Sequence, residues 1–328
     1  MKHTPTAPKL IQFTHPIAEH ILSDSIISTG LPPWKYKWNT KDHKRKFLQA
    51  AGRYLEKKNE KWVECLSDDI KIWCEAEWDT KCDKIPASSY PSHAGISPLP
   101  RFCHHFVPVR FEIPGAYGIN TDPYVFGNVF KYLLCRQVKS ITLRSLPTNS
   151  IILFGSYKQT GFQNGKKQFS FFLDTVFVVD KVLCNVTPGK VPPSSIISKY
   201  PSYVTHAYYR RTLSRLAVQG NKNDCSRIRL CTKSINKLSL YIGRMYSQDN
   251  KSLFSFVPII PNSDCYHRPI LNSLKVKEFG GGIVEAISPN PGPAGIKVTD
   301  IDSPNDVWND LMNHLISQNY FPGVFFNE

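Results

Sequence analysis

The stretch from Ser150 to Asp180 begins Ser-Ile-Ile-Leu-Phe-Gly-Ser-Tyr and ends Phe-Phe-Leu-Asp-Thr-Val-Phe-Val-Val-Asp. Both runs are rich in β-branched and aromatic residues, which favour strands, and Asn164-Gly165 lies between them. Glycine adopts a positive φ without steric cost and asparagine tolerates it, so we predict a β-hairpin that turns here. The runs are nearly continuous in apolar side chains, which predicts that both faces of the hairpin are covered.

One polar pair, Asp174-Thr175, interrupts the second run of this hairpin. A carboxylate is costly to bury unless it is paired or hydrogen-bonded. Two interpretations follow from the sequence. Asp174 caps a neighbouring loop, or it lines a pocket.

The composition of the chain favours a polyanionic partner. Its 328 residues suffice for one large domain or two smaller ones, and 41 Lys+Arg against 26 Asp+Glu give a formal net charge of +15. Neutralising phosphates with such a surplus supplies affinity through counterion release, so we expect DNA or RNA as the partner. The alternative is a basic protein without such a partner.

The cysteine usage and the N-terminus predict a cytoplasmic protein. Nine cysteines stand at irregular spacings, and the polar N-terminus lacks the apolar core of a signal peptide, so we expect free thiols. No apolar stretch is long enough to cross a bilayer, so we expect no membrane partner. The run 103–105 (Cys-His-His) has no partner pair at zinc-site spacing, and we expect no metal and no cofactor.

Two segments near the N-terminus are candidates for nucleic-acid contact. After a strand predicted over residues 10–15, Trp34, Tyr36 and Trp38 alternate with lysines, which suits stacking on bases or anchoring of a loop to the core. A helix is predicted over residues 41–51. It crowds four basic side chains into one turn, where they contact phosphate or are merely solvated: His43, Lys44, Arg45 and Lys46.

The run 70–78 carries the most suggestive chemistry. Its alternation predicts a strand with Lys71, Trp73, Glu75 and Glu77 on one face, and the two carboxylates would lie roughly 7 Å apart. On an open sheet these polar side chains would simply be exposed to solvent. At the mouth of a barrel it would be an acidic pocket with an aromatic wall, able to read a base edge or move a proton.

The remaining segments give coarser predictions. We expect a loop over 81–103, a strand over 106–113, and a helix over 124–135 whose start at Asn120 to Asp122 offers free N–H groups to an anion. Arg210 and Arg211 lie among tyrosines and are further candidates for nucleic-acid contact. Strands are expected over 238–243 and 253–260, a turn at 280–282, and a last amphipathic helix from Ser303-Pro304 with one apolar stripe of Val307, Leu311 and Leu315.

Several motifs, taken in order, resemble an uncharacterised bacterial protein family. They are Phe-Thr-His-Pro at 13–16, His-Lys-Arg-Lys-Phe at 43–47, Trp-Cys-Glu-Ala-Glu-Trp at 73–78, Asn-Thr-Asp-Pro-Tyr-Val-Phe-Gly at 120–127, and Leu-Phe-Gly-Ser at 153–156 with Leu-Asp-Thr-Val-Phe-Val-Val at 173–179. More loosely, the chain is similar to the barrels of PUA, ASCH and EVE-like domains. That resemblance implies a domain that reads nucleic acid, sometimes a modified or flipped base.

We therefore predict an α+β fold with a mostly antiparallel, barrel-like core and peripheral helices. Residues 1–184 would form the β-rich core domain, and residues 185–328 would form an extension that completes the sheet, or one continuous domain with it.

Three functions fit these features, in a setting of bacterial DNA modification or defence. The first is a nucleic-acid-binding protein that holds a base, including a modified one, in a pocket. The second is an enzyme acting on a substituted base, such as a deazaguanine nitrile, with Glu75 or Glu77 as acid or base and Cys74 or Cys135 as nucleophile. The third is a Mg²⁺-dependent nuclease using Glu75, Glu77 and Asp174. The first two are favoured.

Overall fold

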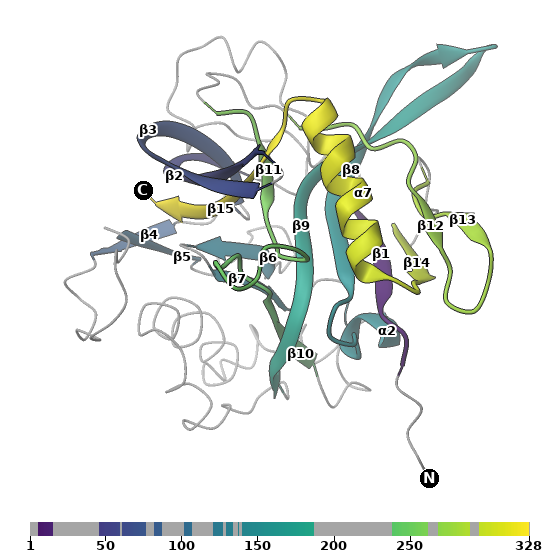
Figure 1. The fold of residues 1–328 in the computed structure, drawn as a ribbon, viewed down its shortest axis with the longest axis horizontal. Helices are drawn as coiled ribbons and strands as arrows, with labels where there is room; N and C mark the ends of the chain where they lie inside the picture. Colours follow the sequence, from purple (N-terminus) through teal and green to yellow (C-terminus); the bar gives the residue numbers. More distant parts are fainter. Residues whose placement is uncertain are drawn as a thin grey trace, which may run out of the picture.

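The computed structural model describes twelve parts of the chain (Figure 1). They are residues 6–15, 46–59, 61–76, 82–86, 102–106, 121–126, 129–133, 137, 140–186, 238–261, 268–288 and 295–327. The described fold is mostly sheet with few helices, which agrees with the predicted α+β class. Its sheets are open, so the prediction of a closed, barrel-like core is wrong for these residues.

A seven-stranded sheet is the centre of the molecule. Its order is β14 (Ile296–Asp300), β1 (Lys9–His15), β8 (Ile151–Gln163), β9 (Lys166–Val186), β10 (Leu238–Gly243), β7 (Val129–Leu133) and β6 (Thr121–Phe126). Only β1 and β8 run parallel, and the other neighbours are antiparallel. The sheet takes strands from both sides of residue 184, and the predicted strands at 10–15 and 238–243 are confirmed.

A second, four-stranded sheet has the order β11 (Val257–Ile259), β15 (Phe321–Asn327), β2 (Lys46–Lys58) and β3 (Lys61–Ala76). It joins the first sheet just before β11, where Phe256 and Val176 of β9 exchange two backbone hydrogen bonds of 2.9 Å. The predicted strand over 253–260 is therefore shorter than expected. Two small hairpins pair β12 (Lys275–Lys277) with β13 (Ile283–Glu285) and β4 (Cys82–Pro86) with β5 (Phe102–Phe106).

The predicted hairpin at 150–180 is confirmed. Its turn is Asn164-Gly165, with φ of 50° and 73°, the left-handed values that this residue pair favours. Alternate residues of β8 enter two different apolar clusters, Ile151 and Leu153 in one and Ile152 and Phe154 in the other, and all four are fully buried. Both faces are covered at the base of this hairpin, as its apolar runs predict, whereas residues 162–168 around the turn are exposed.

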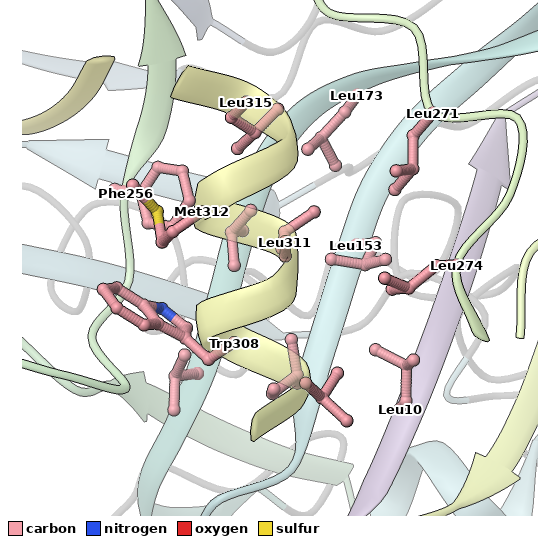
Figure 2. Close-up of a cluster of buried hydrophobic side chains, with 14 of the residues drawn as sticks. Leu10, Leu153, Leu173, Phe256, Leu271, Leu274, Trp308, Leu311, Met312 and Leu315 are labelled. Carbon is pink, nitrogen blue, oxygen red and sulfur yellow. The ribbon is translucent and has the colours of Figure 1, made fainter. Parts of the chain in front are cut away.

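The helix α7 (Pro304–Ser317) covers one face of the sheet (Figure 2). The Ser303 hydroxyl accepts a hydrogen bond from the backbone N–H of Asp306. Pro304 lies in the first turn, where the backbone N–H groups have no acceptor within the helix, so its missing N–H removes no hydrogen bond. The predicted apolar stripe of Val307, Leu311 and Leu315 is buried, together with Trp308 and Met312. The helix is not the last element, because β15 follows it.

The predicted helix over 41–51 is wrong where the structure describes it. Residues 46–51 belong to β2, which pairs with β3 from Lys46↔Ala76 to Lys58↔Lys61 and with β15 on its other side. β3 pairs along most of β2, and β15 adds a second partner at residues 51–54. The hydrogen bonds of this sheet outweigh a local preference for helix. Residues 41–45 lie outside the described residues.

The predicted helix over 124–135 is also wrong, because β6 and β7 form a hairpin there. Tyr124, Val125 and Phe126 favour a strand, and β6 ends the described sheet, where Pro123 can be tolerated. The pairing register shifts between Thr121 and Tyr124, around that proline. The loop predicted over 81–103 contains β4 and the start of β5. Of the strand predicted over 106–113, only Phe106 is described, as the last residue of β5, and residues 107–113 lie outside the described residues.

Gly155 allows β8 and β9 to approach closely at a bulge. A Cβ at this position would lie 2.2 Å from the Phe172 carbonyl oxygen and 2.6 Å from the Phe171 ring. Because backbone cannot move aside cheaply, Gly155→Ala is expected to lower the free energy of unfolding by about 3 kcal/mol. The measurement is chemical denaturation. Gly161→Ala on the same strand, where no atom lies within 4 Å of the added Cβ, is the control and should change stability by about 0.5 kcal/mol or less.

Candidate functional site

A pocket of about 250 Å³ lies between the end of the β2–β3 hairpin and α7. We call it the lysine pocket. Eight residues line it: Lys57, Lys61, Trp62, Lys251, Asn309, Met312, Asn313 and Ile316.

Three segments far apart in the sequence bring these side chains together. Lys57 and Trp62 are direct cross-strand partners, so their side chains lie side by side on one face of the hairpin. Lys251 follows a turn in which the N–H of Asn250 donates to the Ser247 carbonyl at 3.0 Å. Asn309 and Asn313 are four residues apart on α7, and therefore lie on one face of it.

Trp62 forms an anchored apolar wall of the pocket. Its indole meets Phe254 and Trp308 edge to face, with ring centroids 6.4 Å away in both pairs. It is half-buried and packs against the apolar cluster under α7. A ring held by two others loses little further entropy when a ligand contacts it, which suits a binding surface.

The lining has three ammonium groups and no carboxylate. The two acidic side chains of this hairpin that the structure describes are engaged elsewhere. Glu64 accepts a hydrogen bond from Arg53 at 2.6 Å, and Glu56 pairs with Lys58 at 2.9 Å on the face of β2 opposite to Lys57.

A second polar cluster on β2 and β3 favours protonated Tyr54 and Cys65 beside an ionised Glu56. Burial, followed by the hydrogen bond to Glu56, raises the pKa of the Tyr54 hydroxyl. Burial and the Glu56 charge raise the pKa of the Cys65 thiol, while the hydrogen bond from Lys58 lowers the pKa of Glu56 against the effect of burial. Cys65 is thus a thiol at neutral pH and a poor nucleophile.

Asp174 is buried and fixed by Arg268. The Arg268 Nη1 donates to Asp174 Oδ1 at 2.6 Å and to the Ser156 hydroxyl at 2.8 Å, and the side chains of Arg268 and Asp174 are 8% and 1% exposed. The chain after Arg268 continues along β9, because Leu173 N–H donates to the Pro269 carbonyl at 3.0 Å. Asp174 therefore holds a neighbouring segment in place, a role similar to the loop cap that was one of its two predicted roles.

Burial raises the pKa of the Tyr320 hydroxyl to about 12, and the positive charge of Arg268 opposes this shift.

The predicted acidic site is divided between two sheets. Glu75 and Trp73 lie on β3 of the four-stranded sheet, where their partners on β2 are Phe47 and Gln49. Asp174 lies on β9 of the seven-stranded sheet. The premise that their strands belong to one barrel is wrong for the described residues. Lys46 and Asp122 lie in strands β2 and β6, so the helix start predicted around Asp122 as an anion site does not exist. The other site candidates lie outside the described residues: Glu77, Cys135, Trp38, His43, Lys44, Arg45, Asn120, Arg210 and Arg211.

Within the described ranges, no group of three or more histidine, cysteine, aspartate or glutamate side chains could hold a metal ion. Nor is any helix among those ranges both long enough and apolar enough to cross a membrane.

Sequence reasoning missed every residue of the lysine pocket. A local signal existed, because residues 57–62 read Lys-Lys-Asn-Glu-Lys-Trp and Asn309 and Asn313 share a helical face. The sequence does not show that these segments contact one another in the folded chain.

No protein-family model, no curated protein and no solved structure matches the chain.

Proposed function

We propose that this protein binds nucleic acid and holds one nucleotide unit of it in the lysine pocket. The observation that carries the proposal is a set of three lysines, one tryptophan and two asparagines around about 250 Å³, with no carboxylate among the lining residues. Lysine ammonium groups bind phosphate oxygens as point charges. Trp62 offers an apolar surface to the base or sugar, and asparagine amides can hydrogen-bond a base edge.

The size of the pocket fits one unit of a polymer. Pockets that enclose a free small molecule usually measure roughly 300 to 1,000 Å³, and this one is smaller. Its lysines come from the exposed end of a hairpin and from a loop, so neighbouring phosphates of a strand can extend past them.

The charge of the rest of the chain supports the same partner. Residues 187–237, which lie outside the described residues, contain ten lysines and arginines and one acidic residue, Asp224. A surplus of this size attracts polyanions from a distance and speeds their association.

The pocket favours binding over the two catalytic alternatives. A base-modifying enzyme and a nuclease each need an acid, a base or a metal ligand beside the nucleotide. The pocket lining has no carboxylate, histidine or cysteine, and Asp174, a member of the predicted catalytic set, is buried against Arg268.

The test of the proposal is the triple variant Lys57→Ala, Lys61→Ala, Lys251→Ala. If the three ammonium groups contact phosphates, the slope of log affinity against log salt should become less steep by roughly 2 to 3. Fluorescence polarisation with a labelled oligonucleotide, repeated from low to physiological salt, measures this slope.

The matched control removes the same charge at a distance from the pocket. Lys181, Lys275 and Lys277 are exposed and line no part of it, and their triple alanine variant should keep the parent slope to within about 1. Equal slopes for the two triple variants, or no binding by the parent at low salt, would contradict the proposal. Both variants should keep the parent thermal midpoint, because all the substituted side chains are exposed.

A further inference from the structure

The β8–β9 hairpin extends beyond the body of the molecule as an arm (Figure 1). We define the arm as residues 157–170. Pairing of β8 with β1 ends at Ser156, and within the arm the two strands pair from Lys158↔Ser170 to Gln163↔Lys166. Seven residues of extended strand span roughly 20 Å.

The far end of the arm is open to solvent on both faces. A Cβ added at Gly161 or Gly165 would meet no atom within 4 Å. Phe162 is 67% exposed, and it is the cross-strand partner of Lys167. Gln163, Lys166 and Gln168 are also exposed, and no aspartate or glutamate occurs from residue 150 to residue 173.

This set of side chains indicates an anionic partner with apolar surface. Lysines on a strand edge can simply prevent unwanted pairing with another sheet. That role does not explain Phe162, because a large exposed aromatic ring has a cost in water that a partner can offset. Lysines beside an aromatic ring and two amides match phosphates beside base edges, and the absence of carboxylates removes the main source of repulsion.

We propose that the arm enters the major groove of double-helical DNA. That groove is about 12 Å wide in B-form DNA and admits a two-stranded β-ribbon, whereas the deep, narrow major groove of A-form RNA does not. Phe162 and Lys167 lie on one face of the arm, and Gln163, Lys166 and Gln168 lie on the other. The face with Phe162 turns toward the bases, where the ring contacts apolar edges such as the thymine methyl group. Lys166, Lys167 and the two glutamines contact the phosphates that border the groove. The inference rests on the proposed function and adds that the partner is duplex DNA, gripped at a second surface distinct from the lysine pocket.

The experiment uses the full chain and three probes of one sequence: duplex DNA, duplex RNA and single-stranded DNA. The parent is expected to bind duplex DNA at least about tenfold more tightly than duplex RNA. Phe162→Ser should weaken duplex DNA binding about tenfold, because the phenylalanine ring would no longer be partly buried against the DNA. The affinity for single-stranded DNA should stay unchanged. Lys166→Ala with Lys167→Ala should make the salt slope on duplex DNA less steep by roughly 1.8.

The controls separate failure of this inference from failure of the proposed function. Lys275→Ala with Lys277→Ala removes two exposed lysines of another hairpin and should keep the parent slope. Arm variants that bind duplex DNA like the parent, while the pocket variant is weakened, would overturn the arm proposal alone. Equal weakening on all three probes would overturn it as well, because the arm would then be a general polyanion contact.

Sedimentation of the arm variants tests a different role. If they lose self-association and keep their affinity for DNA, the arm is a contact between two copies of the chain. A parent that binds none of the probes would overturn both proposals.

Discussion

Asp174→Ala is expected to lower the free energy of unfolding by about 3 to 5 kcal/mol, because it leaves the Arg268 guanidinium buried without its charged partner. The guanidinium side chain is only 8% exposed, so water cannot replace the lost carboxylate without opening the structure. The Ser156 hydroxyl and the Phe172 ring, whose centroid lies 5.4 Å from the guanidinium carbon, would remain as neighbours. Denaturant titration followed by circular dichroism measures the loss.

Two further variants identify the cause. The double variant Asp174→Leu, Arg268→Met removes both charges and should recover most of the stability, to within about 1 kcal/mol of the parent. Asp180→Ala on the same strand is the control for removing a carboxylate, because Asp180 is part exposed and lies 3.7 Å from Lys181; it should cost about 1 kcal/mol or less. A loss below about 1 kcal/mol in Asp174→Ala would mean that the buried pair is not a source of stability.

The elements whose local pattern agrees with their tertiary surroundings were predicted from the sequence. The β8–β9 hairpin combines a turn that requires positive φ with two strands whose base is buried on both faces, so the turn chemistry and the apolar pattern indicate the same structure. The α7 helix likewise has a capping serine, a proline in its first turn and an apolar stripe at helical spacing. Each of these signals lies within about 30 residues of sequence.

Two strands were predicted as helices because their local composition suits a helix. Residues 46–51 are rich in side chains that suit a helix, but β15, more than 250 residues later, pairs with the strand they begin. The Asp-Pro pair at 122–123 is a common helix start, yet it lies in a strand that ends the described sheet, where the missing proline N–H can be tolerated. The hydrogen bonds that decide these cases are made with other strands, β3 and β15 in the first case and β7 in the second, and the composition of the two segments does not indicate them.

The candidate site was likewise only partly predictable from the sequence. Asp174 could be recognised as a buried carboxylate that needs a partner, but the sequence did not show that the partner is Arg268, which lies 94 residues away. The lysine pocket joins residues 57–62, Lys251 and four residues of α7, and no one of these segments predicts a site alone. The charge surplus led us to expect a polyanionic ligand, and the folded chain brings together the three lysines at which we propose that it binds.

Trp308→Ala is expected to lower the free energy of unfolding by about 4 kcal/mol. Trp308 is 1% exposed and packs against Phe254 with ring centroids 4.7 Å apart, and its indole N–H donates to the Phe254 carbonyl at 2.9 Å. Alanine would leave a large cavity between α7 and the sheet, and would also leave that carbonyl without its donor. Trp308→Phe separates the two effects, since it retains a ring and should cost about 1 to 3 kcal/mol.

The same substitution tests the link between the core and the lysine pocket. Trp62 is held edge to face by Trp308, so Trp308→Phe should weaken oligonucleotide binding through a less fixed Trp62 while the salt slope stays at the parent value. Asp310→Ala, an exposed change on the same helix, is the control and should shift stability by about 0.5 kcal/mol or less. A changed salt slope in Trp308→Phe would show that the lysines move with the helix. Parent affinity in this variant, despite the loss of stability, would show that the pocket does not depend on how Trp62 is anchored.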